Sequence, residues 1–272
     1  MTFSIVGRSA DGQSLGVAVA SKFLAVGAVV PAAVSGVGAL ATQAFANLAF
    51  REQGLALLRT GTAAADVIAG LVAADPGRAQ RQVGVVAPTG PGASYTGPEC
   101  FAWAGGVTGD GYAIQGNILT GPEVVAEMER AWLAGSALSL PRRLHAALAA
   151  GDAAGGDSRG RQSAALYSVR HGAGYGGATD TEIDLRVDDD PDPVGRMSQL
   201  ISLWELYFTK PDPTTLLPLV DDLAHEVHER VTALGYTSLA AWAGVENLEE
   251  RLTDGAVDPL VLEQLRAAKP KP

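Results

Sequence analysis

Two residues near the start of the chain, Thr2 and Lys22, have side chains that could do chemistry together. Thr2 becomes the amino-terminal residue if Met1 is removed, and it is small enough for methionine aminopeptidase to do so. A free Thr2 carries a nucleophilic hydroxyl and an α-amine base with a pKa of roughly 7.7–8.0. Lys22, the only lysine before Lys210, would keep that amine neutral by like-charge repulsion and stabilise developing negative charge. These residue types predict N-terminal nucleophile catalysis; in the alternative, Thr2 only starts a strand and Lys22 reaches the surface.

Polar residues in a glycine-rich loop, GGDSRGRQSAAL, form the second candidate group. The consecutive glycines allow a ligand or another backbone to approach closely. Asp157 beside Arg159 makes a compact ion pair or a clamp for a substrate carboxylate. We place Asp157, Arg159 and Gln162 on the substrate-binding side of the predicted site. An ordinary tight loop with surface charges is the alternative interpretation.

Residues at strand ends supply the third group. Asn117 offers an amide donor of the kind that lines oxyanion holes. Thr42 and Gln43 end another predicted strand, and Ser21 stands directly before Lys22. We expect Asn117 to act in catalysis, and we expect the substrate to meet Ser21, Thr42 and Gln43. In the alternative interpretation, these hydroxyl and amide residues are ordinary turn residues at the ends of strands.

Other kinds of site are disfavoured by residue counts and spacing. The four histidines and Cys100 occur without a GxSxG elbow, which disfavours serine and cysteine hydrolase triads. The segment His225–His228 puts two histidines three residues apart, whereas the zinc metalloprotease motif places them four apart. The acidic run DDDPDP lacks the alternating ligand spacing of a calcium loop. We therefore expect no metal and no cofactor.

The composition limits the partners and the location of the protein. The 272 residues carry a net charge of −10 with a pI near 4.8, which disfavours binding to nucleic acids and anionic membranes. The apolar runs are interrupted by Gly, Ser or Pro well before they reach the length of a membrane span. The chain begins with a strand pattern rather than a secretory signal, so we expect a cytoplasmic protein. The single Cys100 excludes an intramolecular disulfide.

The candidate residues are distributed over a series of strand and helix patterns. Residues 2–6 and 15–20 predict a hairpin whose loop contains Asp11 and Gly12, residues that tolerate positive φ. Further strands are predicted at 27–35, 37–44, 82–87, 93–96, 112–118, 163–169 and 181–187. Helices are predicted at 46–59, 62–74, 121–132, 138–150 and 194–208. Groups of strands separated by pairs of helices predict an α+β fold, a four-layer αββα sandwich.

A change in composition after the segment Lys210–Pro213 (KPDP) indicates a second domain. From Pro211 onward, eleven Asp and Glu stand against five Lys and Arg, and the residues favour helices. We therefore divide the chain into an αββα domain of residues 1–200 and a small helical C-terminal domain of residues 201–272. Limited proteolysis is predicted to cleave near Lys210–Pro213.

Several stretches resemble known families. The opening, TFSIVGRSADGQSLGVAVASKFLAVGAVV, is similar to that of N-terminal nucleophile hydrolases such as proteasome β-type subunits. The stretches GALATQAFAN, QGNIL, GGDSRGRQSAAL and DLRVDDDPDP resemble the family of unknown function DUF1028, from residue 2 to about 200. That resemblance implies the N-terminal nucleophile hydrolase fold without an established substrate. The stretches LGYTSLAAWAGVENLEERL and VDPLVLEQLR resemble a peptidoglycan-binding domain, which is typical of a bacterial-type protein.

Two functions are open at this level. In the first, the chain is a hydrolase that uses Thr2 to cleave an amide-type C–N bond of a small-molecule or peptide-like substrate. Lys22 and Asn117 are then its other catalytic residues, and the Lys22 ammonium is expected within hydrogen-bonding reach of Thr2. In the second, the sandwich is a non-catalytic scaffold whose C-terminal domain recognises a cell-wall fragment or another partner. Assembly into a homo-oligomer is compatible with both.

Overall fold

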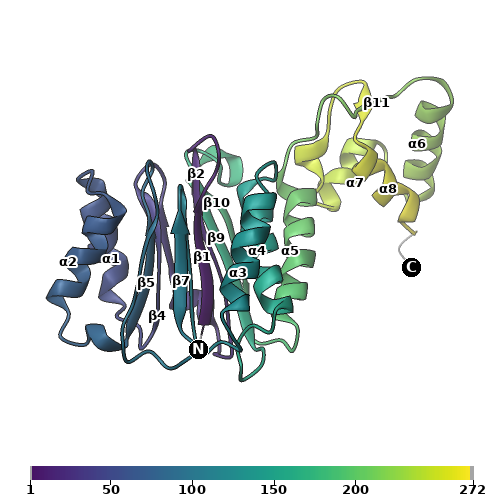
Figure 1. Ribbon diagram of the computed structural model, residues 1–272. Coiled ribbons are helices and arrows are strands. Elements are labelled where there is room, and N and C mark those ends of the chain that lie inside the picture. Colours follow the sequence, from purple (N-terminus) through teal and green to yellow (C-terminus); the bar gives the residue numbers. More distant parts are fainter. Residues whose placement is uncertain (1, 270–272) are drawn as a thin grey trace. The chain divides into compact units, whose positions relative to one another are not determined.

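Strand β1 (Thr2–Arg8), which begins at the candidate nucleophile, lies inside a six-stranded antiparallel sheet (Figure 1). The computed structural model describes residues 2–269. The strand order is β10-β9-β2-β1-β8-β7. The other strands are β2 (Ser14–Ser21), β7 (Gly105–Gly109), β8 (Tyr112–Asn117), β9 (Ser163–Arg170) and β10 (Thr181–Val187). Thr2 is therefore held in a strand that is paired on both sides.

The predicted hairpin at the start of the chain is confirmed. Its loop turns through Gly12 at φ +73°, and the Asp11 carboxylate accepts a hydrogen bond from the Gln13 backbone N–H at 3.0 Å. The register pairs Phe3 with Ala20. Continuing this register by one residue places Thr2 opposite Ser21 on β2. Directly opposed side chains point to the same face of a sheet, so the two hydroxyls lie on one face.

A second antiparallel sheet stacks on the first and has the order β3-β4-β5-β6. Its strands are β3 (Pro31–Val34), β4 (Gly38–Ala44), β5 (Arg81–Val86) and β6 (Ala93–Thr96). The core between the sheets consists mainly of Val and Ala side chains, which let two sheets pack closely. The strand predicted at 27–35 begins only at Pro31, because a 3₁₀ turn, η1 (Val26–Ala28), occupies its first part.

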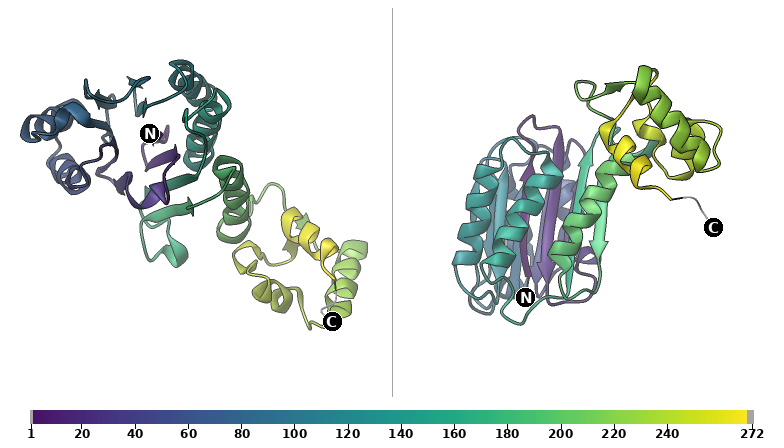
Figure 2. Two further views of the ribbon diagram at one scale, coloured as in Figure 1. Left: turned by 90° about the horizontal axis from the view of Figure 1, so that it is seen from below. Right: turned by 90° about the vertical axis from the view of Figure 1, so that its right-hand side faces the viewer.

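Two pairs of helices cover the outer faces of the sheets, so the first unit is the predicted four-layer αββα sandwich (Figure 2). Helices α1 (Ala49–Arg59) and α2 (Ala64–Ala74) pack on the four-stranded sheet. Helices α3 (Glu123–Ala134) and α4 (Leu140–Ala153) pack on the six-stranded sheet. Gly7 permits this contact, because a Cβ there would lie 2.5 Å from the Trp132 ring.

The remaining helices and short strands follow along the chain. They are α5 (Pro193–Phe208), α6 (Asp221–Ala233), α7 (Leu239–Val245) and α8 (Pro259–Ala267), with β11 (Leu217–Pro218) and β12 (Ala256–Val257). Further 3₁₀ turns are η2 (Arg78–Gln80), η3 (Tyr175–Gly177) and η4 (Glu249–Arg251). Within residues 2–269, no helix is both long enough and apolar enough to cross a membrane.

The chain divides into two compact units between Ile201 and Ser202, a point inside helix α5. The second unit is helical, as expected, and has its own apolar core around Trp242. A buried ion pair between Arg251 and Asp258, at 2.6 Å, lies within it. The cleavage predicted near residues 210–213 falls just after the end of α5 and stays a prediction.

Candidate functional site

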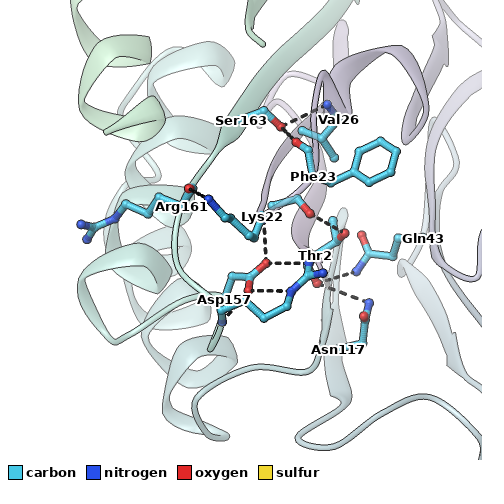
Figure 3. A network of polar contacts seen from close by, with 11 residues as sticks. Thr2, Lys22, Phe23, Val26, Gln43, Asn117, Asp157, Arg161 and Ser163 are labelled. Carbon is cyan, nitrogen blue, oxygen red and sulfur yellow. Dashed lines mark hydrogen bonds and ion pairs between the residues drawn. The ribbon is translucent and has the colours of Figure 1, made fainter. Parts of the chain in front are cut away.

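The Thr2 hydroxyl lies buried at the open end of the β1–β2 hairpin (Figure 3). Its Oγ1 is 3.2 Å from the Ser21 Oγ, and either hydroxyl can donate in this contact. Both residues are almost fully buried, with exposed fractions of 6% and 2%. The hairpin register thus brings the two hydroxyls together, and Ser21 is well placed to orient the hydroxyl of Thr2.

The backbone carbonyl of Thr2 is held by two side-chain amides. The Gln43 Nε2 donates to the Thr2 oxygen at 3.2 Å, and the Asn117 Nδ2 approaches the same oxygen at 3.5 Å. Gln43 comes from β4 in the opposite sheet, whereas Asn117 is the strand partner of Thr2 on β8. The start of β1 is therefore fixed from both sheets, as Figure 3 shows.

A third amide, Gln82 on β5, fixes the other two. Its Oε1 accepts from the Gln43 Nε2 at 2.8 Å and from the Asn117 Nδ2 at 2.9 Å. Its own Nε2 donates to the Gly116 carbonyl at 2.7 Å, so the amide has its oxygen turned toward Gln43 and Asn117. Gln82 is completely buried. Gln82 was not among the residues predicted from the sequence, because a polar residue on a predicted strand carries no signal of its own.

The same network continues between the sheets through Ser4 and Gln115. The Ser4 Oγ donates to the Gln43 Oε1 at 2.7 Å and accepts from the Gln115 Nε2 at 2.6 Å. Within residues 2–269 the Gln115 Oε1 has no hydrogen-bond partner, and it packs against Gly84, where a Cβ would come within 2.1 Å of it. A buried amide is costly unless it is hydrogen-bonded, so this network favours one arrangement of the residues around Thr2.

Asp157 ties the glycine-rich loop to the end of β2. Its Oδ2 accepts from the Lys22 backbone N–H at 2.7 Å, and its Oδ1 accepts from the Arg159 backbone N–H at 2.9 Å. The Arg159 side chain adds an ion pair to the carboxylate at 3.3 Å and is about half exposed. The predicted pairing of Asp157 with Arg159 is therefore present, and it lies beside the hairpin end that carries Ser21.

The position of Lys22 differs from the expectation. Strand β2 ends at Ser21, and the Lys22 side chain that follows it is exposed. Its Nζ donates to the Arg161 carbonyl at 3.3 Å, and Figure 3 shows the side chain running toward Arg161 instead of toward Thr2. The exposed ammonium stays solvated and needs no buried partner. What Lys22 gives to the site is its backbone N–H.

Two further predicted residues lie apart from this network. The Thr42 hydroxyl is buried and donates to the Asn47 carbonyl at 3.3 Å, which closes the loop after β4. The Gln162 side chain donates to the Asp189 carboxylate at 3.1 Å at the surface. Side chains alternate along β4, so Gln43 faces the opposite sheet and Thr42 does not.

Two cavities reach the residues around Thr2. A cleft of about 610 Å³ is lined by Asn117, Arg159 and the segment around Phe101. A second cavity of about 400 Å³ is lined by Ser21 and Asp157. Cys100 also lines the larger cleft, but burial raises the pKa of its thiol, which disfavours a thiolate nucleophile.

Among residues 2–269, no group of three or more His, Cys, Asp or Glu side chains is arranged to hold a metal ion. The histidines of the segment His225–His228 lie on helix α6, and His225 pairs with Glu229 at 3.1 Å on an exposed surface. His145 is used structurally as well, because its Nε2 contacts the Val194 carbonyl at 3.0 Å.

The chain is similar to known protein families and to a solved structure. Residues 207–265 match the model described as "Putative peptidoglycan binding domain". The crystal structure of protein SPO2555 from Silicibacter pomeroyi, a DUF1028 protein, is similar with a TM-score of 0.67 and 29% sequence identity. The match covers 83% of this chain and 92% of that one. No functionally curated protein matches. The family model described as "Family of unknown function (DUF1028)" matches residues 2–197, so the chain belongs to this family.

Proposed function

We propose that the protein is an N-terminal nucleophile hydrolase that cleaves an amide-type C–N bond of a small-molecule or peptide-like substrate. Thr2 is the nucleophile after Met1 has been removed in the cytoplasm. The observation that carries the proposal is the hydroxyl of Thr2, which is buried beside Ser21 at the hairpin end while amides from both sheets fix its carbonyl. A residue that only started a strand would not require such a network.

The chemistry follows from the two groups that a free Thr2 carries. Its hydroxyl oxygen attacks the amide carbonyl carbon, and the hydroxyl proton moves to its own α-amine. The resulting ammonium gives that proton to the leaving nitrogen as the C–N bond breaks. Water then hydrolyses the ester, again with the α-amine as base, and restores Thr2.

Neighbouring residues supply orientation and charge stabilisation in this proposal. The Ser21 hydroxyl orients the attacking oxygen through the 3.2 Å contact. The Asn117 amide is the oxyanion donor, because it lines the larger cleft and its contact to the Thr2 carbonyl is long, at 3.5 Å. Asp157 and Arg159 orient the substrate, and Arg159 lines the same cleft as Asn117. The Lys22 side chain has no part, since it is exposed and donates to Arg161.

Intact mass and covalent labelling test the proposal together. Protein purified without an N-terminal tag is expected to lack Met1 and to begin at Thr2. A β-lactone probe should then acylate Thr2 and add its full mass, with a labelling rate that rises with pH through the titration of the α-amine. Thr2→Ala should abolish labelling, whereas Thr2→Ser should retain it. Retention of Met1 on most molecules would refute the proposal.

The second candidate function is recognition of a cell-wall fragment by the C-terminal unit, on a scaffold that does no catalysis. The match of residues 207–265 to a peptidoglycan-binding domain favours it. A groove of about 300 Å³ in that unit is lined by Tyr207 and Tyr236, which suits a sugar or peptide ligand. Co-sedimentation with purified peptidoglycan should fall when both tyrosines are changed to alanine. Unchanged sedimentation would exclude this groove.

A further inference from the structure

Two exposed phenylalanines flank the larger cleft beside Thr2. Phe45 follows β4 and is 71% exposed, and Phe101 lies in the loop before β7 and is 75% exposed. Asn117 lines the same cleft and contacts the Thr2 carbonyl, so the cleft lies next to the residue that carries the candidate nucleophile. Large apolar side chains that remain this exposed beside a cavity are typical of a ligand-binding surface.

The backbone that presents these rings is both strained and anchored. Ala44 and Ile118, which also line the cleft, have φ values of +66° and +51°. A β-branched residue rarely adopts this conformation, and such strain is concentrated at functional sites. The Ile118 N–H donates to the Phe101 carbonyl at 2.8 Å, and the Phe45 N–H donates to the Gln80 carbonyl at 3.2 Å. The rings therefore project from fixed positions.

The Phe45 ring also makes a cation–π contact with Arg81. The Arg81 guanidinium lies 5.5 Å from the ring centroid and donates to the Phe45 carbonyl at 2.5 Å. Asp75 fixes Arg81 through an ion pair at 2.8 Å. Arg81 and Asp75 thus support an aromatic ring that is itself 71% exposed.

We infer that this cleft binds an aromatic side chain of the substrate, placed against Phe45 and Phe101 while the scissile carbonyl lies at Thr2. The inference rests on the proposed function and adds a substrate class to it: amides with an aromatic substituent on one side of the bond. An aromatic group gains both apolar burial and ring–ring contact on such a surface. The volume of about 610 Å³ is within the range of small-molecule sites.

Two β-lactone probes that differ in one substituent, benzyl or methyl, test the inference. In each reaction the Thr2 oxygen attacks the lactone carbonyl and the ring C–O bond breaks. The hydroxyl proton reaches the ring oxygen through the α-amine, so the adduct has the summed mass. The wild-type protein is expected to react with the benzyl probe about tenfold faster, or more, as apolar pockets typically discriminate.

Variants assign this preference to the cleft. Replacing both Phe45 and Phe101 by alanine should lower the benzyl rate at least fivefold and leave the methyl rate within about twofold. Tyr175→Ala is the matched control, because Tyr175 is 74% exposed in the turn η3 and does not line the cleft. It should change neither rate. A benzyl preference that survives the double replacement would overturn the inference.

Calorimetry with N-acetyl-L-phenylalaninamide separates this inference from the proposed function. The compound should bind the wild type and Thr2→Ala alike, and binding should be lost in the double alanine variant. If neither probe labels Thr2 but this pattern of binding is observed, the aromatic site is supported and the assignment of Thr2 as the nucleophile is refuted. If both probes label Thr2 equally fast and the compound does not bind, the assignment of Thr2 as the nucleophile is supported and the aromatic site is refuted.

Discussion

Gln82→Leu tests whether the buried amide network holds the start of β1. The substitution keeps a similar volume and removes four hydrogen bonds of 2.9 Å or less, to Gln43, Asn117, Gly116 and Thr96. A typical hydrogen bond contributes about 1 kcal/mol net, and a buried donor left unpaired adds a further penalty. We therefore expect the free energy of unfolding to fall by about 3–5 kcal/mol, which still leaves many domains folded.

Amide hydrogen exchange of β1 and β5 peptides measures this loss in the first unit alone. Gln80→Leu is the control, because Gln80 is two residues away, exposed, and bonded to Glu99 at 3.1 Å. It should change stability by no more than about 0.5 kcal/mol. In Gln82→Leu the rate of Thr2 acylation should also fall, since both amides on its carbonyl lose their common acceptor. A stability loss below about 1 kcal/mol would refute the role assigned to Gln82.

Three other predictions follow from single contacts. Lys22→Met should leave Thr2 acylation within about twofold, because the ammonium is exposed and donates to Arg161; a tenfold loss would contradict the structure. Gly7→Ala should reduce the free energy of unfolding by about 1–3 kcal/mol through overpacking against Trp132, and unchanged hydrogen exchange in β1 would argue against it. The hydrogen bond from Arg81 lowers the pKa of Asp75 to about 2, so this carboxylate stabilises the fold above about pH 4 and ceases to do so as pH falls toward 2. Urea midpoints of Asp75→Asn at pH 5 and pH 2.5 should therefore differ less than those of the wild type.

Local patterns were enough to predict the elements that position the site. The hairpin at the start of the chain follows from alternating residues around Asp11 and Gly12, which interact only with their neighbours. The helices follow from apolar stripes, and small Val and Ala side chains on both faces indicate strands covered on both sides. Thr2 could be proposed because a free N-terminal threonine is a catalytic unit by itself.

Only the tertiary structure decided which polar groups meet Thr2. In the sequence, Gln82 cannot be distinguished from any other polar residue on a strand. It is buried and accepts a hydrogen bond from Asn117 only because the two sheets face each other. Asn117 reaches the Thr2 carbonyl from 115 residues away. The Lys22 ammonium was expected near Thr2, yet β2 ends one residue earlier and the side chain donates to Arg161 at the surface. Residue type and periodicity are local properties, whereas the convergence of side chains depends on the register and stacking of strands that are distant in the chain.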